Sequence, residues 1–445
     1  MKKLCVGCIS LCSILFLACN FGLKKDFATV QIDFGASSPL ERALDSATAL
    51  PILSSTRIKI ETEGSISGYS AVELPPQAPK NISLNLPVGD TVVIKVSAYN
   101  PSGIWSGSVT HRVEEGANAV SVKLGKKVSG LNKLLFTQKK TVNEMGHTNY
   151  DLTLYLGGKK IDLIGSEASY SFARDSLGRV LVGYTVTNLC VDRYTSEGNL
   201  DVNGTVMAAD SFANDYTTGK MYAHISNDNQ LVQIEDNLSG QVVAMGLDGR
   251  VFAADNGRIA WVDTGSQLLK VAPIPNSVSS LGTHFFGTQI DDDIEIDDCE
   301  PSEVTDLFMR GSYVYVLFTT EYKLPGFSNP FYIFGGVVRY NVNDLGEEPV
   351  KIGFDDPDID TDDHTFDKSY YAQNFYGAVK VIGFDDDNIY IADDGFDSAY
   401  VEDGYGHHHL NITADRNRIA ALNIRTNSLS FTDAAPAKWF NEWTR

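Results

Sequence analysis

The sequence predicts an all-β protein in which an N-terminal β-sandwich is followed by a β-propeller of about six blades. Polar and apolar residues alternate with a period of two over many short segments, which indicates strands with one buried face. Turn-forming Gly, Pro, Asn and Asp residues separate those segments. A degenerate repeat of strand pairs fills residues 130–445, and only residues 40–50 have helical periodicity. These observations favour two β domains in series.

The composition is that of an acidic folded protein. Hydrophobic residues make up 43% of the 445 residues and charged residues 21%, which excludes a wholly disordered chain. The formal net charge of −21 excludes a general nucleic-acid-binding protein, because phosphate backbones are bound by basic surfaces. The chain has no Gly-rich nucleotide loop, no His-Glu-x-x-His and no Gly-x-Ser-x-Gly motif, so no motif indicates an enzyme class.

Residues 1–18 have the layout of a secretory signal peptide. Two lysines precede an apolar stretch of 15 residues, Leu4–Ala18. This stretch is shorter than the roughly 18 to 20 apolar residues of a membrane-spanning helix, and no later segment reaches that length. The sequence therefore predicts export of the chain to the cell envelope.

The signal segment ends in Phe-Leu-Ala-Cys at residues 16–19, which resembles the lipobox of bacterial lipoproteins with departures at its first two positions. The resemblance implies acylation of Cys19, a tether over residues 19–26, and attachment to a membrane through the N-terminal acyl chains. Each buried CH₂ of such chains contributes about 0.8 kcal/mol. The residue after Cys19 is Asn20. An aspartate at this position would imply retention in the inner membrane, so by the same resemblance the outer membrane is expected. The alternative is an ordinary cleaved signal peptide.

Residues 27–125 are expected to form the sandwich. Alternating segments follow one another closely, separated by turns such as Pro87–Asp90, and six or seven short strands in about 100 residues are typical of two packed sheets. The segments Val88–Asp90, Val96–Tyr99 and Val120–Val122 resemble the immunoglobulin-like modules of bacterial surface lipoproteins. The resemblance implies a fold and no chemistry. The predicted strands cover residues 29–34, 57–61, 81–86, 91–99 and 118–124.

Residues 130–445 contain five clear copies of a strand–turn–strand unit and one weaker copy. Each clear copy has an Asp- or Gly-containing turn and is followed by two further strands. One four-stranded sheet cannot bury both of its faces, whereas a ring of such sheets can, which favours a propeller. The alternative is another all-β arrangement, such as further sandwiches. The clear copies begin at Ser171, Ser211, Val243, Val304 and Val379, and the weaker copy begins at Gly130.

Two of the copies resemble NHL repeats. Residues 249–259 are similar to the family pattern Gly-x-Val-x-Val-Ala-Asp followed by Arg-Ile. Residues 388–395, continued at residues 417–419, are similar to the same pattern with an insertion between its parts. The resemblance implies a propeller of the NHL type.

Four long insertions interrupt the repeats. If the first strand of each blade lies nearest the axis, the loops between second and third strands and the connections between blades emerge on one face. The insertions at residues 276–303 and 354–377 are expected between blades, and those at residues 320–336 and 394–416 between second and third strands. All four are therefore predicted on the same face, which is expected to be the binding surface because long loops on a rigid scaffold commonly carry function.

The insertions are rich in carboxylates, which raises the question of a metal site. Asp358, Asp360 and Asp362 have alternate spacing, and calcium prefers several carboxylate oxygens. His407 and His409 lie on the same side of an extended segment and form a second candidate metal pair. Calcium is thus the one candidate cofactor. The alternative is a solvated acidic loop with exposed histidines.

Aromatic residues crowd the same insertions. Exposed rings beside carboxylates suit recognition of a protein or a glycan, because rings bury much surface at small entropic cost. The alternative is that the rings fill the space inside a widened ring of blades. The candidate binding residues are Tyr322, Phe327, Phe331, Tyr332, Tyr370, Tyr371, Tyr376 and Tyr405.

The sequence predicts a non-catalytic, lipid-anchored binding protein of the cell envelope, with a membrane and a protein or glycan as partners and no nucleic acid. The alternative function is that of a calcium-dependent propeller hydrolase or lyase that uses central carboxylates. Outside the signal segment the cysteines are Cys190 and Cys299, and the sequence leaves open whether they form a disulfide.

Overall fold

The computed structural model describes most of the chain between residues 27 and 434. The signal peptide, Cys19, the tether, the candidate helix at residues 40–50, Phe327, Tyr405 and His407 lie outside the described residues. No helix within the described segments is long and apolar enough to cross a membrane. These segments are residues 27–33, 57–64, 72–74, 81–100, 103–129, 135–142, 148–156, 158–165, 170–175, 178–185, 189–206, 209, 211–225, 228–281, 286–324, 330–362, 364–384, 387–402 and 408–434.

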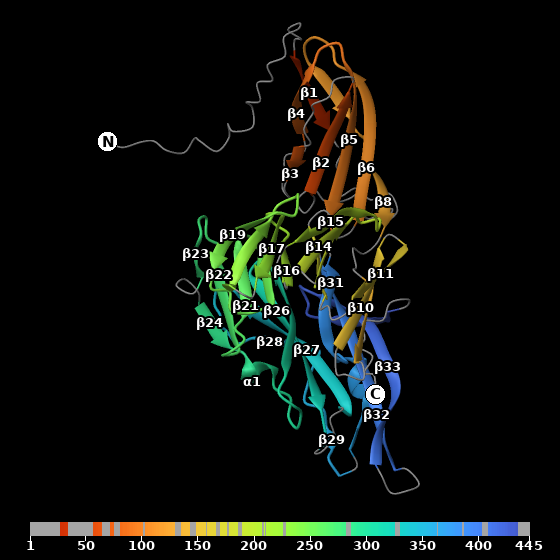
Figure 1. Cartoon of the computed structure of the whole chain (residues 1–445), viewed down its shortest axis with the longest axis vertical. Coiled ribbons are helices and arrows are strands. Elements are labelled where there is room, and N and C mark those ends of the chain that lie inside the picture. The colour runs from red at the N-terminus through yellow and green to blue at the C-terminus, as the bar shows by residue number, and fades with distance from the viewer. Residues whose placement is uncertain are drawn as a thin grey trace, which may run out of the picture.

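The N-terminal part is a sandwich of two sheets at one end of the molecule (Figure 1). Strand β1 alternates strictly between exposed and buried residues, as the sequence predicts, and buries Val30 and Ile32 against Ile58, Ile94 and Trp105. One sheet has the order β4 (Asn81–Pro87), β1 (Phe27–Asp33), β7 (Asn118–Ser121). The other has the order β3 (Val72–Leu74), β2 (Arg57–Gly64), β5 (Thr91–Asn100), β6 (Gly103–Arg112), β8 (Gly125–Ser129), so it ends slightly beyond residue 125.

Six groups of three or four strands follow in the described part of the chain and form the propeller, and the last two groups are joined in one eight-stranded sheet. The first holds β9 (Leu135–Val142), β10 (Thr148–Leu156) and β11 (Lys159–Gly165). The second holds β12 (Tyr170–Arg174), β13 (Val180–Thr185), β14 (Leu189–Tyr194) and β15 (Leu200–Val206), and the third holds β16 (Ser211–Asp215), β17 (Lys220–Ile225), β18 (Gln230–Ile234) and β19 (Gly240–Met245). The fourth holds β20 (Phe252–Asp255), β21 (Arg258–Val262), β22 (Leu268–Pro273) and β24 (Phe286–Gln289).

The last two groups carry the longest strands. The fifth holds β25 (Glu303–Arg310), β26 (Tyr313–Tyr322), β27 (Tyr332–Asn341) and β28 (Val350–Ile352). The sixth holds β31 (Ala378–Phe384), β32 (Asn388–Glu402), β33 (His408–Asn423) and β34 (Leu429–Asp433). A single residue pair, Tyr332 with Asp397, joins β27 to β32 and links the two groups.

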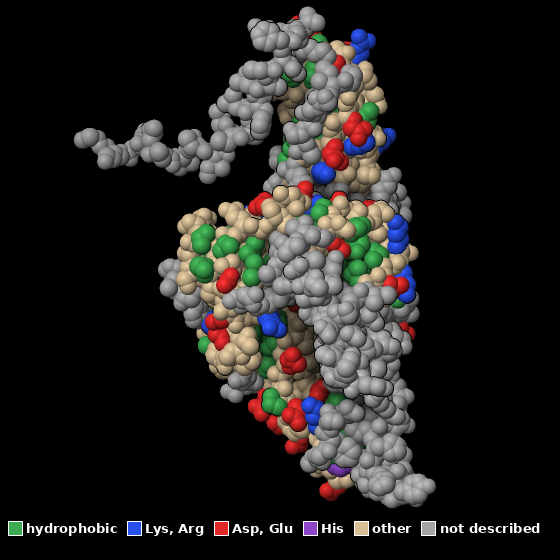
Figure 2. Space-filling view, viewed as in Figure 1, with side chains coloured by type: hydrophobic (Ala, Val, Ile, Leu, Met, Phe, Trp, Pro, Cys, Tyr) green, Lys and Arg blue, Asp and Glu red, His purple; other side chains and the backbone are tan. Residues whose placement is uncertain are grey.

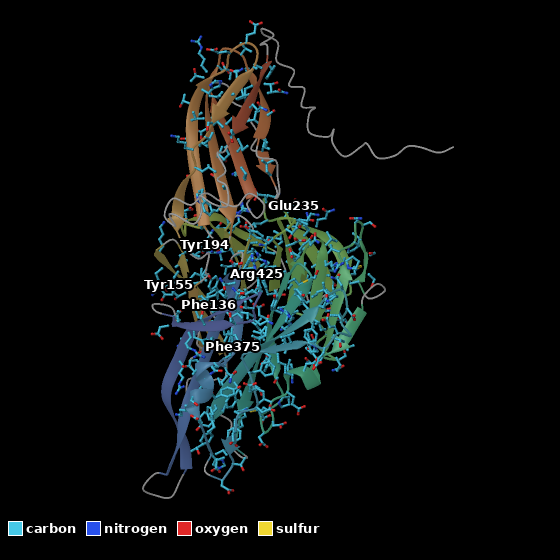
Figure 3. All side chains as sticks on the ribbon, turned by 180° about the vertical axis from the view of Figure 1, so that it is seen from behind. Phe136, Tyr155, Tyr194, Glu235, Phe375 and Arg425 are labelled. Carbon is cyan, nitrogen blue, oxygen red and sulfur yellow. The ribbon has the colours of Figure 1, made fainter. Side chains whose placement is uncertain are left out.

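The groups are arranged as blades around an axis, with the first strand of each blade innermost. Strands β12, β16, β20, β25 and β31 pack on one another in that order. The ring closes where β9 and β10 share a core with β12 and β13 on one side and with β31 to β33 on the other. The rings of Phe136 and Phe172 meet there with centroids 4.6 Å apart, and Figure 3 shows Phe136 near Tyr155 and Tyr194 at this junction.

Buried aspartates at the ends of two inner strands fasten the third blade to the fourth and the fourth blade to the fifth. Asp215, at the end of β16, accepts hydrogen bonds from the backbone N–H groups of Asn256 and Gly257 in the following blade, at 3.1 and 2.8 Å. Asp255, at the end of β20, accepts one from Gly311 in the blade after that, at 2.8 Å. A carboxylate bound to backbone N–H groups satisfies turn donors that would otherwise lack a partner. The same device therefore occurs at two successive blade junctions.

The strand assignment predicted for the third copy is wrong by one strand. Residues 243–247 were expected to begin a blade, but residues 240–245 form β19, the outer strand of the preceding blade. The inner strand of the next blade is β20, at Phe252–Asp255. Outer and inner strands have similar apolar patterns and similar turns, so a pattern search cannot tell which strand opens a blade.

This shift also separates the two segments that resemble NHL repeats. Ala254 and Asp255 end the inner strand β20, whereas Ala392 and Asp393 lie in the second strand, β32. The two matches therefore occupy different positions in their blades, and the expectation of an NHL-type propeller stays a prediction.

Two glycines of the fourth blade provide a matched test of its packing. A methyl group at Gly249 would lie 1.9 Å from the backbone oxygen of Val262, whereas one at Gly265 would meet only a side-chain oxygen of Asp263 at 3.4 Å. We predict that Gly249→Ala lowers the free energy of unfolding by about 1–3 kcal/mol, because the backbone of β21 must move. Gly265→Ala is expected to leave it nearly unchanged. Urea titration followed by tryptophan fluorescence compares the two, and equal midpoints would contradict the packing described.

Candidate functional site

Residues 290–303 of the first insertion lie together with the other three insertions at the end of the propeller opposite to the sandwich. Figure 1 shows α1 (Asp291–Ile294), the ends of β27, β32 and β33, and the hairpin of β29 (Ile359–Asp360) and β30 (Thr365–Phe366) at that end. Two kinds of contact hold them there: Tyr340 of β27 donates to Asp293 of the first insertion at 3.0 Å, and Gly335 of the second insertion forms a β-bridge with Phe375 of the third. We call residues 290–303, 320–336, 354–377 and 394–416, where described, the distal platform.

The first insertion differs from its expected form. Residues 276–303 were predicted to connect two blades, but they include β24, the outer strand of their own blade. They also include β23 (Ser279–Ser280), which pairs in parallel with β19 of the preceding blade. The difference follows from the strand shift described above. Because that blade begins at β20, it has only three strands before residue 276, and its fourth strand, β24, falls inside the predicted insertion.

Most of the candidate binding aromatics are buried in a hydrophobic core that continues from the fourth and fifth blades into the platform. The exposed fractions of Tyr322, Phe331, Tyr332 and Tyr371 are 5%, 2%, 5% and 4%. The ring of Tyr332 meets Phe366 edge to face at 4.5 Å between centroids. The prediction that these four rings are exposed for a ligand is therefore wrong, and the rings fill space between the insertions instead. Tyr370 and Tyr376 are half-buried at the edge of the cluster.

The tyrosine hydroxyls of this core are hydrogen-bonded within the platform. Tyr332 donates to the carbonyl oxygen of His364 at 3.1 Å, and the Tyr322 hydroxyl lies 3.1 Å from Nδ1 of the same histidine. Tyr371 donates to the carbonyl oxygen of Ile333 at 2.7 Å, and Tyr370 donates to that of Asp355 at 2.8 Å. Each bond joins two parts of the platform, and satisfied hydroxyls are what allow tyrosines to be buried. The platform is therefore internally bonded.

A buried ion pair attaches the platform to the last blade. Asp393 of β32 has no exposed surface and accepts hydrogen bonds from Arg418 of β33 at 2.8 Å, and from the N–H groups of Tyr376 and Gly377 at 2.7 and 3.0 Å. Arg418 also donates to the carbonyl oxygens of Tyr371 and Asn374 at 2.7 and 2.9 Å. Its guanidinium carbon lies 3.6 Å from the ring centroid of Tyr376.

The burial of Asp393 has a consequence for stability. Burial raises the pKa of Asp393 to about 6, although Arg418 and the bound N–H groups oppose the rise. The folded chain then keeps a proton that the unfolded chain, with an ordinary pKa of 3.8, has lost. This group therefore makes the folded state less stable as the pH rises from about 4 to about 6.

The exposed surface of the platform is acidic. Figure 2 shows acidic side chains along the propeller edge near α1 and β29, toward the end opposite to the sandwich. Cys299 is half-buried beneath this surface, and burial followed by the charges of Asp298, Asp356 and Asp297 raises its thiol pKa to about 12. It is a free cysteine, so no disulfide joins it to Cys190. The exposed carboxylates of the platform include Glu295, Asp297, Asp298, Asp355, Asp356, Asp358, Asp360 and Asp362.

The candidate calcium ligands do not converge. Asp360 accepts a hydrogen bond from the backbone N–H of Asp362 at 2.9 Å, so this carboxylate stabilises the turn between β29 and β30. Asp358 and Asp362 are exposed on either side of it. No group of three or more His, Cys, Asp or Glu side chains suited to a metal ion occurs among the described residues. Of the candidate histidines, only the backbone of His409, in β33, is described.

Sequence reasoning missed three residues that organise the site. Asp393 and Arg418 appear only as parts of the resemblance to NHL repeats, and His364 appears as an isolated histidine. No local pattern singles out the pair, because β32 also carries Asp394 and Asp397 and β33 also carries Asp415 and Arg416.

Two segments of the chain match one protein family, TdpA. Residues 25–120 match the model of the TdpA protein N-terminal Ig-like domain, and residues 279–445 match that of the TdpA C-terminal domain. The second match covers the last two blades and most of the distal platform. The sandwich is thus an immunoglobulin-like domain, as the sequence predicts.

The chain is also similar to a curated membrane protein. It is 29% identical, over 97% of its length and 89% of the relative, to the 53 kDa membrane antigen A of Treponema denticola. Solved structures resemble it only weakly. A chain of a nidogen/laminin complex has a TM-score of 0.36 at 10% identity, with 68% of this chain and 93% of that chain covered. A Bacteroides thetaiotaomicron protein of unknown function has a TM-score of 0.35 at 10% identity, with 80% and 88% covered.

The contribution of the buried pair of Asp393 and Arg418 to stability can be measured by comparison with an exposed ion pair of the same blade. We predict that Arg418→Met lowers the free energy of unfolding by about 3–5 kcal/mol, because it leaves a buried carboxylate without its partner. The loss is expected to grow between about pH 6 and pH 8, because the pKa of Asp393 then rises further and its ionisation costs more. Thermal melts at several pH values measure this.

Arg425→Met is the control for that variant. Arg425 pairs with Asp387 at 2.8 Å, but the two side chains are 73% and 52% exposed. Its removal is expected to change stability by less than about 1 kcal/mol at every pH. A similar, pH-independent loss in both variants would show that the buried pair does not hold the platform as described.

Proposed function

We propose that this protein is a lipid-anchored, non-catalytic component of the cell envelope that binds a protein partner through the distal platform. The N-terminal acyl chains on Cys19 would hold it to the membrane, with the outer membrane as the expected location. The sandwich then spaces the propeller from the bilayer. The similarity to a membrane antigen supports an envelope location.

The position of the platform carries the proposal. The sandwich follows the anchor in the chain, and the platform lies at the opposite end of the propeller (Figure 1). It is also the part of the propeller with the most added structure, held by a core that it shares with the fourth and fifth blades and by the pair of Asp393 and Arg418. Elaborated loops on a rigid scaffold are where binding surfaces commonly lie.

The chemistry of the platform favours a protein over a glycan. Sugars are commonly held by exposed aromatic rings, and the rings of Tyr322, Phe331, Tyr332 and Tyr371 are buried. What the platform presents to solvent is carboxylate, on the first and third insertions. Such a surface matches a basic patch on a protein, and charge complementarity of this kind gives specificity and a fast association rate.

The alternative function, a calcium-dependent hydrolase or lyase, has no observation in its favour among the described residues. Its central carboxylates would need to converge on a metal, and the described inner-strand aspartates Asp215 and Asp255 bind backbone N–H groups instead. It stays a prediction of the sequence.

Anchoring is tested by removing the acylated thiol. In the bacterium that makes the protein, Cys19→Ser is expected to abolish incorporation of labelled palmitate and to release the chain from the membrane fraction. Cys299→Ser is the control, because this half-buried thiol lies in the propeller, and it is expected to change neither. Retention of label in the Cys19 variant would contradict the lipobox interpretation.

Recognition is tested by neutralising the platform surface. Glu295→Gln, Asp358→Asn and Asp362→Asn combined remove three exposed carboxylates of the first and third insertions. We expect the full chain in detergent to capture an envelope protein at low salt, and the triple variant to capture at least ten times less. The reason is that a desolvated charge pair across an interface contributes more than an exposed one.

The matched control neutralises carboxylates elsewhere. The control variant combines Glu115→Gln on the sandwich with Glu348→Gln and Asp433→Asn on parts of the propeller outside the platform. It changes the net charge by the same amount as the platform variant, and capture is expected to persist. Treating the envelope extract with protease should abolish capture, and treating it with periodate should not. Loss of capture after periodate alone would identify a glycan ligand and overturn the choice of partner.

A further inference from the structure

A cavity of about 290 Å³ lies between the second and third blades, at the end of the propeller that faces the sandwich. Figure 3 shows one of its lining residues, Glu235, at the edge of the propeller next to the sandwich. The cavity is therefore separate from the distal platform, which lies at the other end. Its volume is close to the lower bound of about 300 Å³ for small-molecule pockets, so it suits a compact ligand.

The lining combines charged groups of both signs with an apolar part. Three cationic side chains line the cavity, one just before β13, one in β14 and one in β17, and three carboxylates balance them. Leu181, Met221, Ile234 and Leu238 supply the apolar part. The charged residues are Asp175, Arg179, Arg193, Lys220, Glu235 and Asp236. The net charge of the lining is zero in a chain of net charge −21, yet charges of both signs are held close together.

Two guanidinium groups are oriented in the same way by their neighbours. Arg179 donates through Nε to Asp175 at 2.6 Å and through Nη1 to Asp236 at 2.7 Å. Arg193 donates through Nε to Asp201 at 2.7 Å and through Nη1 to the backbone oxygen of Asp236 at 2.6 Å. The Nη2 groups of both have no partner among the described residues and are not sealed from solvent. They are donors held in place without an acceptor.

Asp236 completes the arrangement from the neighbouring blade. Its side chain is 75% exposed, and only its Oδ1 binds the two arginines, at 2.7 and 3.2 Å. Burial alone would raise the pKa of Asp236, but Arg179, Arg193 and the nearby Lys59 of the sandwich lower it. The carboxylate therefore stays ionised, and its Oδ2 is not used by the two arginines. Glu235, which like Asp236 follows β18 and lines the cavity, accepts a hydrogen bond from Gln233 through Oε1 at 2.9 Å.

We propose that this cavity binds a small aliphatic zwitterion, of the size of an α-amino acid or a dipeptide. The ligand carboxylate accepts from the Nη2 groups of Arg179 and Arg193, the ligand ammonium group is bound by Asp236 and Glu235, and the aliphatic part packs on Leu181, Met221, Ile234 and Leu238. Paired arginines suit a carboxylate because their planar donors bind it bidentately. A ligand with both charges pairs with the arginine donors and with the carboxylates, whereas one with a single charge leaves one of these groups without a partner.

The test compares probes that share one aliphatic body. Saturation-transfer NMR on the full chain in detergent is measured with L-leucine, L-leucyl-L-leucine, N-acetyl-L-leucine and L-leucinamide. The last two each lack one of the two charges. We expect saturation of leucine, of the dipeptide, or of both, and at least tenfold weaker binding of the two single-charge analogues.

Variants locate the binding in this cavity. Arg179→Lys keeps a cation beside Asp175 but removes the planar Nη2 donor, and Glu235→Gln removes one partner of the ammonium group. Both are expected to lose at least tenfold in affinity for the zwitterion that binds. Arg425→Lys and Glu348→Gln repeat these changes at exposed positions outside the cavity, and they are expected to bind as the unchanged chain does.

The outcomes decide the proposal. Loss in both cavity variants with unchanged melting temperatures supports it. The proposal is overturned if neither zwitterion is saturated, if N-acetyl-L-leucine binds as well as leucine, or if both cavity variants bind normally. Because the probes and variants do not touch the distal platform, failure here leaves the proposed recognition of a protein partner unaffected.

Discussion

The distal platform depends on one buried charge pair. Without Asp393, the backbone N–H groups of Tyr376 and Gly377 would lack their hydrogen-bond acceptor. Without Arg418, the carboxylate of Asp393, which has no exposed surface, would lack its counter-ion. The pair therefore fixes where the third insertion ends and where β31 begins. Since that insertion supplies Tyr370 and Tyr371 to the aromatic core, the position of the core follows from the position of the pair.

Part of the acidity of the chain serves its architecture. Asp215 and Asp255 bind turns of the next blade, and Asp360 binds the turn of its own hairpin. A propeller has many tight turns whose N–H groups point along the axis, and an aspartate is short enough to reach them while staying attached to a strand. The remaining carboxylates, on the platform surface, have no such internal role, which is why they are the ones to which we assign recognition.

Sequence patterns predicted the features that depend on local burial. Alternation located β1, which has one face in a core. The strand–turn–strand repeat located β25 and β31 as first strands of their blades. The direction of the strands placed the later three insertions and the end of the first on one face. The repeat failed at residues 243–247, where an outer and an inner strand look alike. Sequence patterns also could not tell exposed rings from buried ones, because Tyr322 is buried by His364, which is 42 residues away in the chain.

The short strand β23 has a consequence for how these molecules lie beside one another. It pairs with Ala244 and Met245 and so covers part of the outer edge of β19. An uncovered edge strand offers a row of free backbone groups to which another chain can add a strand. Proteins tethered to one membrane meet side by side at high local density, where such lateral strand addition would lead to aggregation. The first insertion thus returns to the preceding blade through β23 and covers part of the exposed edge of that blade.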